Sequence, residues 1–233
     1  MSGYRFEEFM DIIRKLRSEE GCPWDREQTH ESLRNCLLEE CYETIEAINN
    51  RDNDNLCEEL GDVLLQVALH SVIAEEKQEF TIDQVITGEA EKMIRRHPHV
   101  FGGAVAEDSE GVLKNWEEIK KQEKGSDDIV KELLGVPKAF PAMLRAEKIQ
   151  KKAAKAGMNP EGLEQALKRV QQGLKELEKG IESGNNSDFQ EEIGEVLFGV
   201  VNLSRILQID AENSLTNATN KFINRFVDIF AQA

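Results

Sequence analysis

Residues 37–67 read LLEECYETIEAINNRDNDNLCEELGDVLLQV, and this stretch carries both a helical pattern and a chemical one. Two acidic clusters, Glu39-Glu40-Cys41-Tyr42-Glu43 and Glu58-Glu59-Leu60-Gly61-Asp62, lie on either side of a polar break. Each cluster places two carboxylates three residues apart, which makes them neighbours on one face of an α-helix, with about 5–6 Å between their Cβ atoms. On facing helices the two pairs would form a cage of carboxylate oxygens, the ligands that Mg²⁺ and Mn²⁺ prefer.

Apolar residues recur at intervals of three and four almost everywhere in the sequence, which is the period of an amphipathic helix. In the opening stretch and its flanks this pattern runs through Leu33, Leu37, Cys41, Ile45 and Ile48, and then through Leu56, Leu60, Val63, Leu64 and Val67. No segment is convincing as a strand. Glycine, proline and asparagine separate the helical runs. The sequence therefore predicts an all-α fold.

The charge of the chain limits its partners. Its 233 residues include 45 acidic and 29 basic side chains, a net charge of −16, which argues against binding to nucleic acid or to an anionic membrane. No run approaches 18 apolar residues, and the N-terminus has no apolar signal region. The four cysteines form no CxxC motif and are expected to be free thiols. We expect a cytoplasmic protein.

An internal repeat organises the chain. Residues 57–73, CEELGDVLLQVALHSVI, align without gaps on residues 190–206, QEEIGEVLFGVVNLSRI, each residue 133 positions further on. The same offset places Gly173 where the first copy has Glu40. The second copy thus keeps its apolar stripe and has only three of the four candidate ligands.

A polar segment at 123–128, followed by Gly135, Pro137 and Pro141, predicts a connection between the two copies. We expect an N-terminal catalytic domain at residues 1–124, a linker at 125–140 and a C-terminal degenerate domain at 141–233.

Adjacent glutamates in each cluster point in different directions, because successive residues of a helix are turned by about 100°. Glu40 and Glu43 lie near the apolar stripe of their helix, and Glu59 and Asp62 flank that of the next. We expect these four to be the ligands, with Glu39 in the outer shell of the site or in solvent. The alternative is a solvated acidic helix face, which two clusters at matched positions disfavour.

A basic group follows in the sequence. Lys92, Arg95 and Arg96 share one face of a predicted helix that ends at the turn His97-Pro98-His99. In so acidic a protein they are candidates for a phosphate clamp, because Arg offers forked donors and Lys a point charge. Equally, cations favour helix C-termini through the macrodipole. The sequence leaves both interpretations open.

Together these residues resemble the MazG nucleoside triphosphate pyrophosphohydrolases, members of the all-α NTP pyrophosphatase superfamily. EECYE followed by EELGD matches the family pattern EExxE…EExxD. The resemblance covers essentially the whole chain, and four flanking segments strengthen it: GCPWD at 21–25, RRHPHVF at 95–101, WEEIK at 116–120 and PAMLRA at 141–146.

The resemblance implies hydrolysis of a nucleoside triphosphate between its α and β phosphates, for clearing the nucleotide pool. It implies that Mg²⁺, for which Mn²⁺ can substitute, is held by the catalytic acids Glu40, Glu43, Glu59 and Asp62. It also implies a substrate-binding set in which the cations face the phosphates and the indole stacks near the base: Glu39, Lys92, Arg95, Arg96, Trp116 and Lys120. Which carboxylate activates the water stays open, as does the base preference.

The same resemblance implies two tandem MazG-like helical-bundle units. The second has Gly173 and Glu195 in place of Glu40 and Asp62, and no Trp-x-x-x-Lys segment follows Arg225. We expect activity in the first unit, and a second unit that completes a bundle or a homodimer interface.

Two other classes compete with this interpretation. A carboxylate-bridged di-iron bundle characteristically uses Glu-x-x-His, and neither acidic cluster has a histidine at that spacing. A catalytically silent regulatory or interaction protein would explain the acidity alone, but it gives no reason for one copy to keep all four acids.

Overall fold

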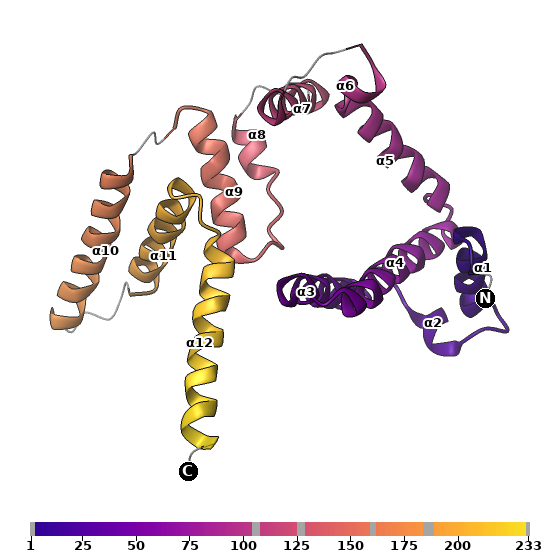
Figure 1. Cartoon of the computed structure of the whole chain (residues 1–233), viewed down its shortest axis with the longest axis horizontal. Helices are drawn as coiled ribbons and strands as arrows, with labels where there is room; N and C mark the ends of the chain where they lie inside the picture. Colours follow the sequence, from indigo (N-terminus) through magenta and orange to yellow (C-terminus); the bar gives the residue numbers. More distant parts are fainter. Residues whose placement is uncertain (1–2, 104–107, 125–128, 159–161, 184–188, 232–233) are drawn as a thin grey trace. The chain divides into compact units, whose positions relative to one another are not determined.

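The computed structural model describes residues 3–103, 108–124, 129–158, 162–183 and 189–231, and in these ranges it contains helices and no strands (Figure 1). The first helices are α1 (Phe6–Arg17), α2 (Pro23–Glu27), α3 (Arg34–Asn50), α4 (Asn53–Glu76), α5 (Ile82–Arg96), α6 (Pro98–Phe101) and α7 (Ser109–Lys124). They are followed by α8 (Ile129–Leu134), α9 (Ala142–Lys155), α10 (Leu163–Ser183), α11 (Phe189–Ile206) and α12 (Ala211–Ala231). The predicted all-α fold is confirmed.

The chain forms two compact units, Met1–Lys120 and Lys121–Ala233. Part of the expected linker, residues 125–128, lies outside the described residues, and α8, in the remainder, packs on α9. The limits expected for the domains stay a prediction. Within the described helices, none is long and apolar enough to cross a bilayer.

Helices α3 and α4 form a tight pair that places the acidic clusters opposite each other. Arg51 ends α3 in the left-handed conformation, with φ of 57°, and the side chain of Asp52 caps α4 by accepting from the backbone N–H of Asn55 at 3.1 Å. So short a connection between packed helices makes them antiparallel neighbours. Glu43 and Glu59 each lie about two turns from this connection, at matching heights.

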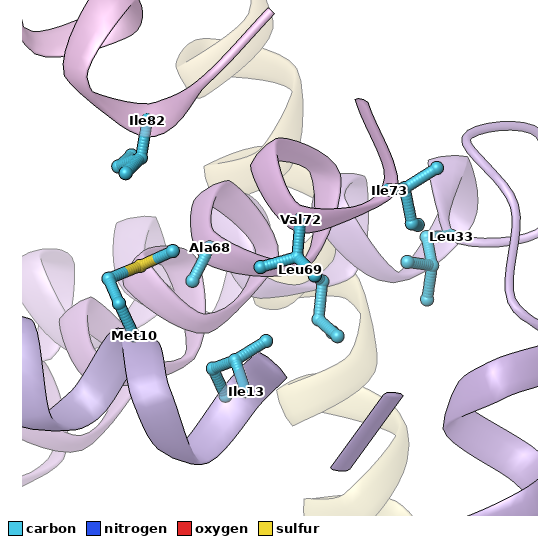
Figure 2. Close-up of a cluster of buried hydrophobic side chains, with 8 residues drawn as sticks. All are labelled: Met10, Ile13, Leu33, Ala68, Leu69, Val72, Ile73 and Ile82. Carbon is cyan, nitrogen blue, oxygen red and sulfur yellow. The ribbon is translucent and has the colours of Figure 1, made fainter. Parts of the chain in front are cut away.

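The main hydrophobic core of the N-terminal unit lies at the other end of this pair. Figure 2 shows buried side chains of α1, of α4, and of the residues that begin α3 and α5: Met10, Ile13, Leu33, Ala68, Leu69, Val72, Ile73 and Ile82. The core thus fixes α4 against α1 and holds the beginning of α3 on α4. The acidic clusters lie beyond it, on helices whose far ends are already anchored.

Arg17 ties the connection between α1 and α3 to this core. Its buried guanidinium pairs with both carboxylate oxygens of Glu76, at 2.8 and 2.7 Å, and donates to the backbone carbonyls of Asp25 and Gln28. The chain turns closely here, because a Cβ on Gly21 would collide with the carbonyl oxygen of Leu16. The Arg17 side chain therefore joins α4 to the segment between α1 and α3.

The predicted apolar stripes are only partly buried within one chain. Leu33 lies in the core, but Ile45, Ile48, Leu60, Leu64 and Val67 are exposed around the acidic end of the α3–α4 pair. Contacts within the described parts of the unit leave these side chains exposed. Apolar side chains that gather on a helix surface are normally covered by another helix or by a partner protein.

We predict that Arg17→Met lowers the free energy of unfolding of the N-terminal unit by about 2 kcal/mol, because two backbone carbonyls lose a charged donor. Arg14→Met is the matched control: Arg14 also pairs across α1 and α4, with Glu75 at 3.2 Å, but is exposed, so the loss should be below about 1 kcal/mol. Both tryptophans, Trp24 and Trp116, lie in this unit, so fluorescence during urea unfolding measures the difference. Equal losses would contradict the role given to Arg17.

Candidate functional site

Three carboxylates meet between α3 and α4. Glu40, Glu43 and Glu59 each offer one oxygen, and these oxygens all lie within 4.8 Å of one another. Glu59 is buried at 9% exposure, Glu40 is half-buried and Glu43 is exposed, so the group extends from the helix interface to the surface. In the part of the chain that the structure describes, no other three acid, histidine or cysteine side chains come this close.

The electrostatics of this group are those of crowded like charges. Burial raises the pKa of Glu40 above its usual range, and the charges of Asp62, Glu43 and Glu39 raise it further. Burial also raises the pKa of Glu59, followed by the charges of Glu43, Asp62, Glu40 and Glu58. A carboxyl group with a raised pKa keeps its proton to a higher pH, and a bound cation would balance the same negative charge in place of that proton. The arrangement therefore favours a bound cation with oxygen ligands.

The remaining acids of the two clusters differ in position. Asp62 is half-buried and close enough for its charge to act on both Glu40 and Glu59, although its oxygens lie outside the 4.8 Å group. Glu39 and Glu58 are exposed. The structure thus separates Glu40, Glu43 and Glu59 from the outer pair as the helical phase predicts, with Asp62 at the margin.

The basic residues gather around an indole. The guanidinium carbon of Arg96 on α5 lies 5.4 Å from the ring centroid of Trp116 on α7, and Nζ of Lys120 lies 4.5 Å from it. Cations over an aromatic face are attracted by its quadrupole. Lys92 pairs with Glu89 on its own helix, and Arg95 is exposed. Arg96 from α5 therefore forms one cluster with Trp116 and with Lys120, which lies one turn further along α7.

The acids and the cations are carried by different helix pairs. Helix α5 meets α4 through Ile82, whose backbone N–H donates to Glu75 at 3.1 Å, near the end of α4 that is remote from Glu59. Arg96 lies at the other end of α5, about 20 Å along its axis. The acids thus meet one another across α3 and α4, whereas Arg96 meets Trp116 across α5 and α7, and Lys120 lies on the same helix as Trp116.

The second copy has a different interior at the corresponding place. A Cβ on Gly173 would lie 2.9 Å from Cγ2 of Val196, a distance that real Cβ atoms essentially never show, so α10 approaches α11 too closely for a side chain there. Glu192, the counterpart of Glu59, is half-buried, while Glu176 and Glu195 are exposed. Where the second copy has no counterpart of Glu40, α10 and α11 are therefore packed closely against each other.

Sequence reasoning placed one pair of histidines and missed another. The turn assigned to His97 and His99 is confirmed for His97, which ends α5 with its Nδ1 2.7 Å from the carbonyl oxygen of Met93, whereas His99 lies in the short helix α6. The contact of His30 with His70 was not expected, because 40 residues separate them. Only a comparison of the two copies would have signalled it.

The family model described as the MazG nucleotide pyrophosphohydrolase domain matches residues 28–101 and again residues 161–230. This confirms the two tandem MazG-like units.

The chain is 47% identical over 226 residues to the Thermotoga maritima nucleoside triphosphate pyrophosphohydrolase/pyrophosphatase MazG, covering 97% of this chain and 85% of that protein. It is 36% identical to the Escherichia coli K12 nucleoside triphosphate pyrophosphohydrolase, covering 97% and 87%. A longer Bacillus subtilis protein, uncharacterized protein YabN, is 47% identical, and 46% of its length is covered. With two tandem all-α copies and this similarity along almost its full length, the chain belongs to the MazG nucleotide pyrophosphohydrolase family.

Proposed function

We propose that the N-terminal unit of this enzyme hydrolyses nucleoside triphosphates to monophosphate and pyrophosphate in a Mg²⁺-dependent reaction that clears the nucleotide pool. The observation that carries this proposal is the convergence of Glu40, Glu43 and Glu59 within 4.8 Å at an interface where Glu59 is buried. The T. maritima and E. coli relatives, which are named nucleoside triphosphate pyrophosphohydrolases, support the substrate class.

The donor set fits a hard divalent cation. Glu40, Glu43, Glu59 and Asp62 would hold Mg²⁺, or Mn²⁺ in its place, because carboxylate oxygens suit these ions and crowded acids gain most from a positive charge. A bound ion would neutralise the phosphates and polarise the phosphorus that is attacked. The protein itself supplies fixed positions for the ligands, and a carboxylate that is not a ligand can orient or deprotonate the attacking water.

The basic cluster would bind the rest of the nucleotide. Arg95, Arg96, Lys92 and Lys120 suit the phosphates, because an acidic protein needs local cations to hold a polyanion. Trp116 suits the base, and the cations over its ring keep the indole beside the phosphate donors. In this proposal Glu39 lies in the outer shell of the metal site, next to the substrate.

We also propose a homodimer in the cytoplasm. The exposed apolar side chains around the acidic end of α3 and α4 would pack on the same side chains of a second copy, which makes a four-helix bundle. This cover would remove water from the flanks of the carboxylate group and strengthen its electrostatics.

We predict that Glu59→Gln reduces turnover at saturating Mg²⁺ at least about a hundredfold without loss of helix content, because a buried ligand charge is removed. The control is Glu58→Gln, an exposed neighbour that should retain activity. Chromatography of the products should give monophosphate and pyrophosphate. Nucleoside diphosphate as the first product, or full activity of the Glu59 variant, would refute the proposal.

If only the N-terminal unit is catalytic, the double variant Glu192→Gln/Glu195→Gln should keep its turnover number within about twofold, because a charge lost where Gly173 already replaces a ligand changes no step of the reaction. Steady-state kinetics and light scattering on the same preparations check this. A large loss of activity with an unchanged oligomer would assign chemistry to the second copy.

For the dimer, Leu64→Glu should shift the sedimenting species towards monomer, because a charge would have to be buried in the interface. Ile12→Glu, which changes a side chain of similar exposure on α1, is the matched control and should leave the mass unchanged. Sedimentation of the unaltered protein as a monomer at micromolar concentration would disprove the dimer.

A further inference from the structure

His30 and His70 form a direct bond between two imidazoles. Their Nδ1 atoms lie 2.8 Å apart, their ring planes are 8° from parallel and their centroids are 5.1 Å apart. That centroid distance equals the bond length extended by one ring radius at each end. The rings therefore meet edge to edge in nearly one plane, which is the geometry of a single N–H···N hydrogen bond.

The surroundings determine which nitrogen donates. Nε2 of His70 is buried and has no hydrogen-bond partner among the described residues, while Nε2 of His30 lies 4.0 Å from a carboxylate oxygen of Glu79. A buried N–H without an acceptor is costly, so His70 carries its proton on Nδ1 and donates to His30. His30 then carries its proton on Nε2, towards the charge of Glu79.

In this arrangement each imidazole carries one ring proton, and a third proton on the pair disturbs the bond. A further proton on Nδ1 of His30 would face the Nδ1–H of His70 at 2.8 Å. To avoid this, His70 would have to move its proton to the buried Nε2, to which the described part of the chain offers no acceptor. The first outcome breaks the bond, and the second reverses its direction at the cost of a buried N–H without an acceptor, so protonation destabilises the closed pair in both cases.

The charges near the pair do not change this conclusion. In the segment before α3, hydrogen bonds from its own backbone N–H and from the Thr29 side chain lower the pKa of Glu31, and the charges of Lys77 and His30 add to this. Glu79 comes from the connection between α4 and α5. The other charged groups at this end of the unit, on α1 and α4, are already joined in ion pairs: Arg14 with Glu75, and Arg17 with Glu76.

The internal repeat separates this pair from the requirements of the fold. With the offset of 133 residues, Leu163 stands in place of His30 and Leu203 in place of His70. The register is sound, because Leu33 and its counterpart Ala166 are both buried at 1% exposure. Helices α10 and α11 thus pack together with leucines at both positions, although Leu163 is the exposed first residue of α10 whereas His30 precedes α3. The histidines occur only in the copy that keeps all four acids.

The pair also lies on the same face of α4 as the acids. Glu59, Asp62, Gln66 and His70 follow one another at intervals of three and four, which places them along one side of the helix. Gln66 is buried, and its counterpart in the second copy is Gly199. This line runs from the carboxylate group to the bond that holds the beginning of α3.

We propose that the His30–His70 bond is a proton-sensitive latch that positions α3, and with it Glu40 and Glu43, against α4 for catalysis. Closed, it fixes residues 28–33, in which Arg17 also holds the carbonyl of Gln28. Open, it leaves the first turn of α3 without this anchor. Both histidines are positioning residues, and their effect on turnover rests on the proposed function.

The sign of the pH dependence follows from the neutral bond. Burial lowers the pKa of His70 below its ordinary value of about 6.5, and the nearby His30 lowers it further. The open state therefore binds protons more readily than the closed one. The latch is closed above about pH 6.5 and opens progressively as the pH falls below it.

The test compares the unaltered protein with the double variant His30→Leu/His70→Leu, which installs the residues of the second copy. With saturating nucleotide and Mg²⁺, the ratio of kcat at pH 7.5 to kcat at pH 5.5 should be about three- to tenfold larger for the unaltered protein than for the variant. Any common loss belongs to the carboxylates, which both proteins share.

A second measurement does not depend on activity. Amide hydrogen exchange, corrected for intrinsic rates, should be faster at pH 5.5 than at pH 7.5 in residues 28–36 of the unaltered protein and unchanged in the variant. If the double variant loses helix content, His30→Gln, which keeps a hydrogen-bonding side chain that does not titrate, replaces it.

The latch would be disproved if kcat fell equally in both proteins at acid pH and if amide exchange in residues 28–36 of the unaltered protein did not depend on pH. Absence of hydrolysis at every pH would instead overturn the proposed function, and the exchange data alone would then decide for or against the latch.

Discussion

The close packing of α3 on α4 is the constraint on which the site depends, because it brings together groups that repel one another. Glu40, Glu43 and Glu59 have no reason of their own to approach within 4.8 Å. The approach is imposed by the two-residue connection at one end of the helix pair and by the core around Leu33 and Ile73 at the other. Apolar contacts of the N-terminal unit thus offset the repulsion between charges that the site holds in place.

Much of this arrangement could be predicted from the sequence, because it is local. The three-residue spacing within each cluster fixes which glutamates share a face, and the structure brings Glu40, Glu43 and Glu59 together while Glu39 and Glu58 stay exposed. Helix type follows from the same periodicity. These features need no knowledge of what each helix packs against.

The rest depends on contacts between distant segments. Periodicity shows that Ile48 and Leu60 belong to apolar stripes, but not that these parts of the stripes remain exposed within one chain. Nor does it show that Trp116 lies against Arg96, or that His30 meets His70 across 40 residues. A side chain whose role depends on a neighbour on another helix can be assigned that role only when the packing of the two helices is known.

The close contact at Gly173 has a consequence for how this chain can change. Restoring the absent ligand by a single substitution would press a new Cβ against Val196, so the variant would lose packing before it gained a metal site. The first copy also has a valine at this position, Val63, so restoring a glutamate at residue 173 requires Val196 or its helix to move. The close packing of α10 on α11 thus opposes, in this copy, a change that the sequence alone would make look simple.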